Sequence, residues 1–327
     1  MTSPPLGILV LGATGTIGRA TVSALLARGH DVVCFVRPPR DGEAGRRGLP
    51  EGCEVRLGDP THRMSVEEDG FRGEAFHAVV SCMASRTGVP SDAWAVDHRA
   101  HLHALEVAKA RGVGHFVLLS AICVQKPRLA FQEAKLAFEE ALRDSGLRWS
   151  IVRPTAYFKS VSGQVKRVKD GKPFLVFGDG SLTACKPIGD QDLAAYLADC
   201  LEDPSRWNRV LPVGGPGPAR TPREQGELLF RLAGAEPRFR SVPAGMLRAV
   251  AAVLGVLGRV VPPLREKAAL ARIGHYYATE SMLVWDEERG RYDADATPEY
   301  GSQTLEDHLR RRLQGEVGDQ RGEHAVF

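Results

Sequence analysis

The chain has 327 residues, of which 43% are hydrophobic and 25% charged, so it can form one large domain and a smaller second part. A formal net charge of +3, from 43 basic and 40 acidic residues, gives no support for a nucleic-acid partner. The six cysteines form no C-x-x-C pair and no cluster, which argues against a zinc or iron–sulfur site. We therefore expect no metal, reduced thiols and a cytoplasmic protein, and we find no export signal in residues 1–5.

Six short apolar runs, rich in branched residues, recur along the first half of the chain. Such runs are typical of buried strands, and several are separated by segments with helical spacing of apolar residues. The runs are residues 7–11, 32–36, 54–57, 78–81, 116–120 and 149–152. This alternation predicts an α/β fold, with a doubly wound parallel sheet of the Rossmann type in residues 1–155.

Helical patterns lie between these strands at 16–28, 91–111 and 129–145, the last ending before Gly146, where a left-handed C-cap is expected. After Pro154 the pattern changes. Helices are predicted at 158–169, at 190–201 and from Thr221 to about residue 232, with a Gly/Pro-rich connection at 214–218. We assign residues 156–314 to a smaller substrate-binding part whose helices return to the Rossmann core, and 315–327 to a disordered tail.

A glycine-rich turn, G-A-T-G-T-I-G, joins the first predicted strand to the first predicted helix. Its three glycines allow the backbone amides at the helix N-terminus to approach a pyrophosphate. The contacts that we predict between this turn and a dinucleotide come from Gly12, Thr14, Gly15, Thr16, Ile17 and Gly18. A glycine-rich turn that binds no ligand is the alternative.

The second predicted strand ends in Arg37, where an NAD-specific site usually has an acidic residue. A guanidinium can pair with a 2′-phosphate, so NADPH is the expected cofactor, with Arg40 as a weaker second contact and a solvated arginine as the alternative. Asp59 follows the third strand, where an acidic residue near the adenine is expected, but it could equally be a turn former. Ser81 and Cys82 follow at the end of the fourth strand, beside the cofactor.

Ser120 and Lys135 have the spacing that short-chain dehydrogenases use around the nicotinamide ribose, and Pro154 ends the neighbouring strand as a further predicted cofactor contact. In those enzymes a tyrosine stands four residues before the lysine, but here the position is Phe131, so the hydroxyl that would protonate a carbonyl oxygen is missing. Lys135 can still bind ribose hydroxyls and supply positive charge for hydride delivery to a carbon–carbon double bond. The alternative is an exposed charge on an amphipathic helix.

Several longer segments resemble the NADPH-dependent divinyl chlorophyllide 8-vinyl reductases. They include V-V-S-C-M-A-S-R-T-G, H-F-V-L-L-S-A-I-C-V-Q-K-P, F-Q-E-A-K-L-A-F-E, S-I-V-R-P-T-A-Y-F-K-S, F-G-D-G-S-L-T-A-C-K-P-I and Y-Y-A-T-E-S-M-L. The resemblance runs from about Gly7 to Leu309. It implies reduction of the 8-vinyl group of a divinyl chlorophyllide or protochlorophyllide to ethyl with NADPH, in chlorophyll or bacteriochlorophyll biosynthesis.

The substrate implied by this resemblance is a planar, largely apolar tetrapyrrole with a carboxylate, which needs an apolar cleft and a nearby cation. Candidate substrate contacts are Tyr157, Phe158, Lys159 and Lys186. Phe158 could instead be core, and the lysines could be solvated. Lys135 and Tyr157 form the candidate catalytic set, and the proton donor stays open among Tyr157, Lys186, Cys82 and water.

The most apolar later stretch, residues 246–261, contains Arg248 and Arg259 and is shorter than the ~20 residues that cross a bilayer. We expect a buried packing helix there. The alternatives are a cover over the pigment or a segment on the membrane surface, which would make the protein peripheral to a photosynthetic membrane.

Two other functions stay open. One is an NADPH reductase of another conjugated alkene, of the isoflavone reductase type. The other is a non-catalytic NADP-sensing or accessory protein with the same fold. The scattered cysteines argue against the unrelated class of 8-vinyl reductases that uses iron–sulfur clusters and flavin.

Overall fold

The computed structural model describes residues 4–38 and 48–317. The chain forms two compact units, each of which is considered by itself. Of the described residues, the first contains 4–38, 48–85, 91–154 and 190–211, and the second contains 86–90, 155–189 and 212–317. The first unit thus takes up a segment from the region that we assigned to the substrate-binding part, because helix α8 (Asp190–Glu202) packs against helix α1 (Thr16–Ala27).

The first unit is built on a seven-stranded sheet. Its strands in chain order are β1 (Gly7–Leu11), β2 (Asp31–Val36), β3 (Glu54–Leu57), β4 (Ala78–Ser81), β5 (His115–Leu119), β6 (Arg148–Pro154) and β8 (Arg209–Val213). The spatial order is β3-β2-β1-β4-β5-β6-β8, and the pairs from β3 to β6 are parallel. The predicted doubly wound fold is confirmed. The strand order reverses between β1 and β4, so a ligand site is expected at the carboxyl ends of these strands.

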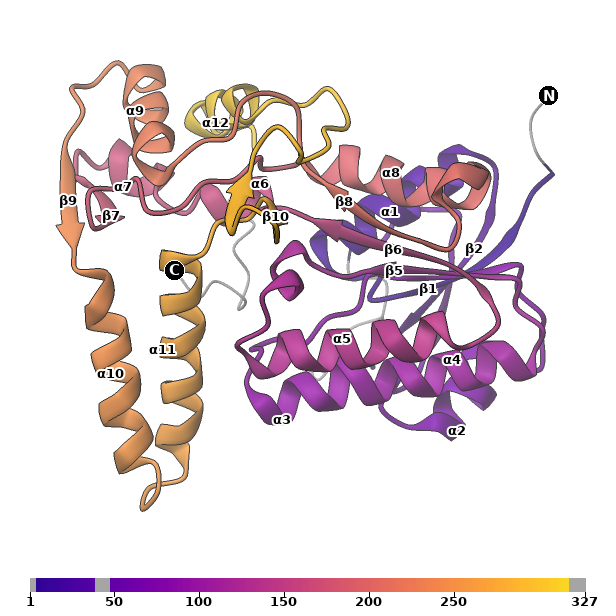
Figure 1. Ribbon diagram of the computed structural model, residues 1–327. Helices are drawn as coiled ribbons and strands as arrows, with labels where there is room; N and C mark the ends of the chain where they lie inside the picture. The colour runs from indigo at the N-terminus through magenta and orange to yellow at the C-terminus, as the bar shows by residue number, and fades with distance from the viewer. Residues whose placement is uncertain (1–3, 39–47, 318–327) are drawn as a thin grey trace. The chain divides into compact units, whose positions relative to one another are not determined.

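Helices cover both faces of this sheet (Figure 1). Helices α1 and α8 lie on one face, and α4 (His101–Ala110) and α5 (Ala130–Arg143) lie on the other. The shorter helical segments of this region are α2 (Arg63–Ser65), η1 (Val66–Phe71), α3 (Pro90–Ala93), η2 (Trp94–Ala100), η3 (Ile122–Gln125) and η4 (Pro204–Arg206). The helix expected at 91–111 is therefore divided, because the π-helical segment η2 separates α3 from α4.

One buried core cluster of the first unit lies between the sheet and helices α4 and α5. Leu9 on β1 and Phe116 on β5 are completely buried, and Phe138 on α5 packs its ring edge-on against Phe116 with 5.8 Å between the ring centroids. Parallel strands that are buried on both faces read as continuous apolar runs, which is why the sequence predicts them well.

The second unit contains two small sheets and a set of helices. Strand β7 (Phe174–Phe177) pairs in parallel with β9 (Phe239–Val242), and β10 (Val284–Asp286) pairs antiparallel with β11 (Arg291–Asp293). The helices are α6 (Phe158–Val161), α7 (Val165–Lys169), α9 (Pro222–Leu232), α10 (Ala244–Leu257), α11 (Pro263–Thr279) and α12 (Leu305–Gln314). Phe158, Phe174, Phe230 and Leu309 belong to its buried core.

Two helix predictions in this unit have different outcomes. The helix expected at 158–169 is two short helices, since α6 ends at Val161, and its C-cap Ser162 donates a hydroxyl hydrogen bond to the Phe158 carbonyl at 2.5 Å. The helix expected from Thr221 is confirmed, because the Thr221 hydroxyl accepts a hydrogen bond from the Glu224 amide and α9 runs to Leu232. The predicted tail lies outside the described residues from position 318 onward.

The prediction of a buried packing helix at 246–261 is wrong, because a helix forms there but most of it is exposed. In α10 only Ala251 is buried, whereas Val253 is 58% exposed and Val260, just after the helix, is 85% exposed. Nowhere in residues 4–38 and 48–317 is there a helix with the length and apolar character that crossing a bilayer requires.

Candidate active site

The glycine turn between β1 and α1 has two glycines that the fold itself requires. Gly12 has a φ of 71°, and a Cβ atom there would lie 2.5 Å from the amide nitrogen of Met83. A Cβ on Gly18 would lie 2.1 Å from the carbonyl oxygen of Gly12. Gly15 differs, because its φ is −69° and the nearest atom to a Cβ would be 3.4 Å away. Packing within the protein does not require a glycine at position 15. Close approach of an external group, such as a ligand phosphate, would require one.

The N-terminus of α1 begins at this exposed glycine. Gly15 is the N-cap, no side chain caps the helix, and its first turn contains no acidic residue. The Arg19 guanidinium donates a hydrogen bond to the Thr14 carbonyl at 2.7 Å and holds the turn, a contact that sequence reasoning missed. Ile17 is 6% exposed, so only its backbone can face a ligand. A helix N-terminus of this kind fits a phosphate group.

Arg37 and Asp59 follow the neighbouring strands β2 and β3. Arg37 is exposed, and Arg40 lies outside the described residues. The Asp59 carboxylate accepts hydrogen bonds from the Thr61 amide at 2.9 Å and the Thr61 hydroxyl at 2.8 Å. Burial raises the pKa of Asp59. The hydrogen bonds from Thr61 and the charges of His62 and Arg37 together lower it by more, so its pKa lies below the ordinary value. The contacts of Asp59 are thus those of a residue that stabilises a turn. A role for Asp59 near an adenine stays a prediction.

Ser81 and Cys82 direct their side chains into the protein. The Nδ1 of His101 lies 2.9 Å from the Val96 carbonyl and must donate to it, so Nε2 accepts from the Ser81 hydroxyl at 2.8 Å. Burial, together with the charge of Lys135, lowers the pKa of His101 to about 4, which keeps this ring neutral. Burial raises the pKa of Cys82 to about 11. Only the backbone of Ser81 and Cys82 is therefore well placed to contact a cofactor.

Ser120 belongs to a buried network that sequence reasoning did not find. Its hydroxyl donates to Glu139 at 2.5 Å, and the Arg153 guanidinium holds both oxygens of the same carboxylate. Glu139 is completely buried. Because the only hydroxyl proton of Ser120 is used here, this oxygen can only accept a hydrogen bond from a cofactor. The available sequence signal was the position of Glu139, one helical turn after Lys135 on the same face of α5.

Lys135 forms a buried ion pair with Asp97. Its ammonium nitrogen lies 3.0 Å from Oδ1 of Asp97, and the two side chains are 11% and 0% exposed. The alternative of an exposed charge is therefore wrong for Lys135. The same Asp97 oxygen accepts a hydrogen bond from the Ser85 amide at 3.2 Å. The other oxygen, Oδ2, is buried and has no hydrogen-bond partner within the described residues, as expected of a group that faces a ligand.

Four of these side chains form a polar cluster at the carboxyl end of β4. Its members are Ser81, Asp97, His101 and Lys135. The helical segments η2 and α4 supply Asp97 and His101, and α5 supplies the lysine. A single positive charge that is held by one carboxylate, with a neutral ring nearby, can bind hydroxyl groups and stabilise developing negative charge.

The predicted substrate residues lie in the second unit. Tyr157 is half-buried at the N-cap of α6, and its ring lies 6.0 Å from the ammonium of Lys159. Phe158 is 4% exposed and packs against His308, with 5.0 Å between the ring centroids. Lys186 is buried, and its ammonium donates to Glu299 at 2.6 Å. The core interpretation therefore describes the position of Phe158, and Lys186 is not a solvated charge.

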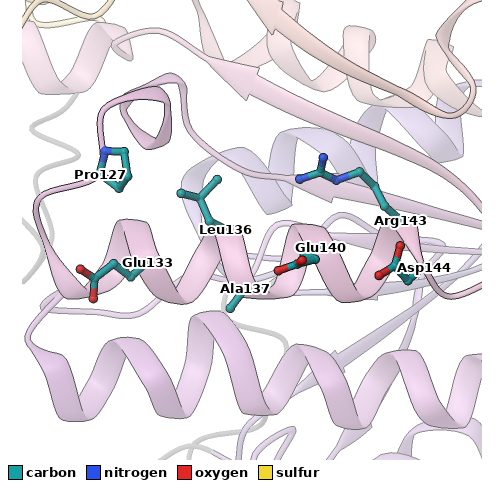
Figure 2. Close-up of a pocket in the computed structure, with 7 residues that line it drawn as sticks. All are labelled: Pro127, Glu133, Leu136, Ala137, Glu140, Arg143 and Asp144. Atoms are coloured by element: carbon teal, nitrogen blue, oxygen red, sulfur yellow. The ribbon is translucent and has the colours of Figure 1, made fainter.

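The hollow in Figure 2 lies on another surface of α5. It has a volume of about 600 Å³. Its lining residues are Pro127, Glu133, Leu136, Ala137, Glu140, Arg143 and Asp144. Those on α5 recur at the spacing of one helix face, and Lys135 and Glu139 lie on the opposite face. This hollow is thus the solvent side of α5 and is separate from the polar cluster.

Comparisons with known proteins agree with this geometry. Residues 12–204 match a family model described as NAD(P)H-binding. The chain is 50% identical over 332 residues to "Divinyl chlorophyllide a 8-vinyl-reductase, chloroplastic" of Oryza sativa subsp. indica, covering 98% of this chain and 82% of that protein. It is 46% identical to the protein of that name in Arabidopsis thaliana, covering 97% and 79%. A solved structure of AtPrR2 with NADP+ and (+)pinoresinol has the same fold, with a TM-score of 0.70 and 18% identity over 94% of this chain and 99% of that one.

Proposed function

The chain belongs to the NAD(P)H-binding family and, within it, to the divinyl chlorophyllide a 8-vinyl-reductases, and on this basis we propose that it reduces the 8-vinyl group of 3,8-divinyl chlorophyllide a or protochlorophyllide a to ethyl with NADPH. The observation that carries the proposal is the high identity to proteins of this name along almost the whole chain. It supports this activity over a reductase of another alkene and over a non-catalytic NADP-binding protein.

The first unit fits NADPH in three respects. Gly15 leaves room for a pyrophosphate, the uncapped N-terminus of α1 provides amides and a positive dipole, and the exposed Arg37 can pair with a 2′-phosphate. Bound NADPH supplies the hydride for the reaction. The predicted contacts of Asp59, Ser81, Cys82, Ser120 and Pro154 are part of this proposal, with Ser81 and Cys82 acting through their backbones and Ser120 as an acceptor.

Lys135 is the proposed catalytic cation. Its ammonium has three donors, of which Asp97 takes one, so the others can hold ribose hydroxyls. Asp97 acts as a positioning residue, because its carboxylate is fixed by the Ser85 amide and holds the lysine in one place. The His101 ring lies nearby and is neutral, so it does not compete with Lys135 for the carboxylate.

The proposed chemistry needs no hydroxyl at the position of Phe131, which is 8% exposed. Hydride adds to the terminal carbon of the vinyl group, and the electron pair of the double bond moves to the carbon that is conjugated with the macrocycle. That carbon then takes a proton, which completes the ethyl group. No oxyanion forms, so a tyrosine at this position would have no carbonyl oxygen to protonate.

Tyr157 is the proposed proton donor. Of the other side chains that sequence reasoning left open, Cys82 is half-buried beside the Thr21 hydroxyl, and desolvation raises its pKa to about 11. The Lys186 ammonium is already paired with the Glu299 carboxylate. Lys159 and Lys186 are the proposed cations for the substrate carboxylate, and Phe158 supports the neighbouring Tyr157 from within the core.

We also propose a role for the second unit and a location for the protein. The second unit, with residues 155–189 and 212–314, supplies the substrate-binding part. A tetrapyrrole is largely apolar, which favours peripheral contact between the enzyme and a membrane surface. The relatives compared above are named chloroplastic, and a cytoplasmic location for this chain stays a prediction.

The test is anaerobic incubation of the purified protein with 3,8-divinyl chlorophyllide a and either NADPH or NADH, followed by absorbance and mass spectrometry. We expect the product to gain two hydrogens, and to do so much faster with NADPH than with NADH. Tight NADPH binding without a change in the pigment would contradict the proposal and favour the non-catalytic alternative.

A further inference from the structure

An apolar stripe runs along one side of helix α10 and continues past its C-terminus. Its members are Met246, Val250, Val253, Val256, Leu257, Val260 and Val261, each between 41% and 85% exposed. Met246, Val250, Val253 and Leu257 are separated by four, three and four residues, so they lie on one face of the helix. Single exposed apolar residues are ordinary, but a continuous stripe of this length indicates a binding surface.

The other side of α10 is already occupied. Helices α10 and α11 form an antiparallel hairpin that follows directly on β9 (Figure 1). Ala251, on the side of α10 away from the stripe, is buried, as are Ala268, Ala269 and Ile273 of α11. The stripe is therefore a second apolar face that remains exposed after the hairpin has formed its own contact.

The tip of the hairpin has a defined shape. The Arg265 guanidinium donates a hydrogen bond to the Gly258 carbonyl at 2.7 Å. A Cβ on Gly258 would lie 2.9 Å from the Arg265 amide nitrogen, so only glycine allows this close approach. As a result Val260 and Val261 are presented at the turn rather than folded back onto the helices.

The exposed charges of the hairpin are mostly positive. Residues 244–279 contain five exposed cations, Arg248, Arg259, Arg265, Lys267 and Arg272, and one exposed acid, Glu266. Within the described part of the chain none of these five forms an ion pair with a carboxylate. An apolar stripe flanked by unpaired cations is complementary to a lipid surface that contains anionic headgroups.

We propose that the α10–α11 hairpin docks this protein on an anionic lipid bilayer, with the apolar stripe in the headgroup region and the cations beside lipid phosphates. Helix α10 has 14 residues and is about 21 Å long at 1.5 Å per residue, too short for a hydrocarbon core of about 30 Å. It therefore lies in the interface and does not span it. The inference specifies the surface for the peripheral membrane contact proposed above, and it does not depend on the reductase activity.

A second copy of the chain is a less suitable occupant. In a two-fold contact the same surface meets itself, so the cations of both hairpins would come together with few carboxylates to neutralise them. A lipid surface carries the opposite charge. For this reason the charges of the hairpin favour a bilayer.

The test is cosedimentation of the full chain with vesicles of phosphatidylcholine alone or of phosphatidylcholine mixed with phosphatidylglycerol. We expect binding to the mixed vesicles that weakens as salt is raised. Val253→Glu combined with Val260→Glu should reduce the partition coefficient at least roughly tenfold. Arg248→Gln combined with Arg259→Gln should reduce it roughly 25-fold, at about fivefold per basic residue.

Matched controls use exposed residues elsewhere in the chain. Met64→Glu, at a residue 57% exposed, and the pair Arg231→Gln and Arg310→Gln, at side chains 65% and 47% exposed, should leave the partition coefficient unchanged. Every variant should reduce detergent-dispersed substrate at the wild-type rate, which separates a failure to dock from a failure to fold or react. Equal losses in the control variants, or no preference for the anionic vesicles, would overturn the inference. So would a stripe variant that only converts a dimer to a monomer, since the occupant would then be a second copy.

Discussion

The ammonium group of Lys135 lies 3.0 Å from a carboxylate oxygen of Asp97, and both side chains are shielded from solvent. The pair joins α5 to the π-helical segment η2, which belongs to a different part of the sequence. A buried ion pair stabilises a fold poorly compared with apolar residues of the same size. Its position at the carboxyl end of β4, beside Ser81 and His101, is better explained by the need to hold one positive charge in a fixed place.

The first prediction concerns this pair. Lys135→Met should lower kcat/KM roughly a hundredfold, because it removes the cation that stabilises developing charge. Asp97→Asn should lower it roughly tenfold, as expected when a residue that only positions another is changed. The double variant should resemble Lys135→Met alone, since Asp97 acts through the lysine. Glu106→Gln, which alters an exposed carboxylate paired with Arg63, is the control. Additive losses in the double variant would contradict a shared role.

The second prediction contrasts two glycines of the same turn. Gly18→Ala should reduce the free energy of unfolding by about 3 kcal/mol, because its Cβ would lie 2.1 Å from the Gly12 carbonyl oxygen. Gly15→Ala should change it by less than about 1 kcal/mol, since its backbone is compatible with alanine. NADPH affinity, measured by fluorescence titration, should nevertheless fall at least roughly tenfold in Gly15→Ala. Unchanged affinity in that variant would show that no phosphate approaches this position.

The third prediction concerns cofactor choice. Arg37→Ala should weaken NADPH binding by roughly 10-fold to 100-fold, which corresponds to about 1.5–3 kcal/mol for hydrogen bonds to a charged group. NADH binding should stay the same, because NADH lacks the 2′-phosphate. Arg63→Ala, at a side chain 44% exposed, is a matched control. If the affinities for NADPH and NADH fell equally, Arg37 would be a structural residue and would not recognise the 2′-phosphate.

The fourth prediction follows from the buried ring of His101, whose pKa burial lowers from its ordinary 6.5 to about 4. As the pH falls below 6.5, the unfolded chain takes up a proton at this residue while the folded protein does not. Stability is therefore fully present above pH 6.5 and is lost as the pH falls toward 4, by about 3 kcal/mol for this residue.

The measurement is the free energy of unfolding in urea at a series of pH values. His101→Gln should flatten the acid side of the profile, and His62→Gln, at a side chain 73% exposed, should not. His115 and His308, whose pKa values burial also lowers to about 4, add to the wild-type slope and remain in both variants. Parallel profiles for wild type and His101→Gln would mean that His101 titrates normally in the folded protein.

Six of the seven strands of the large sheet, and the glycine turn, could be predicted from the sequence because their signals are local. The six apolar runs of the sheet need only their own residues to be recognised, and the glycines lie between a strand and a helix. Strand β8 was missed, because R-V-L-P-V is an edge strand that contains Pro212 and has no continuous apolar run.

The partners within the site could not be predicted in the same way. Asp97 lies in a π-helical segment, where the helical period of 3.6 residues does not give the direction of a side chain. Glu139 and Arg153 meet Ser120 only after β5, α5 and β6 have packed together. The apolar character of residues 246–261 predicted burial, but the sequence does not say whether protein or another surface covers such a helix.

The most direct test of the central claim is to follow the hydride itself. The protein is supplied with 3,8-divinyl chlorophyllide a and NADPH that carries deuterium at the transferred position of the nicotinamide, and the product is examined by mass spectrometry and NMR. We expect an 8-ethyl product with one deuterium, located on the terminal carbon, and a proton from solvent on the adjacent carbon. A reduced product without deuterium, or NADPH oxidation that leaves the vinyl group intact, would contradict it.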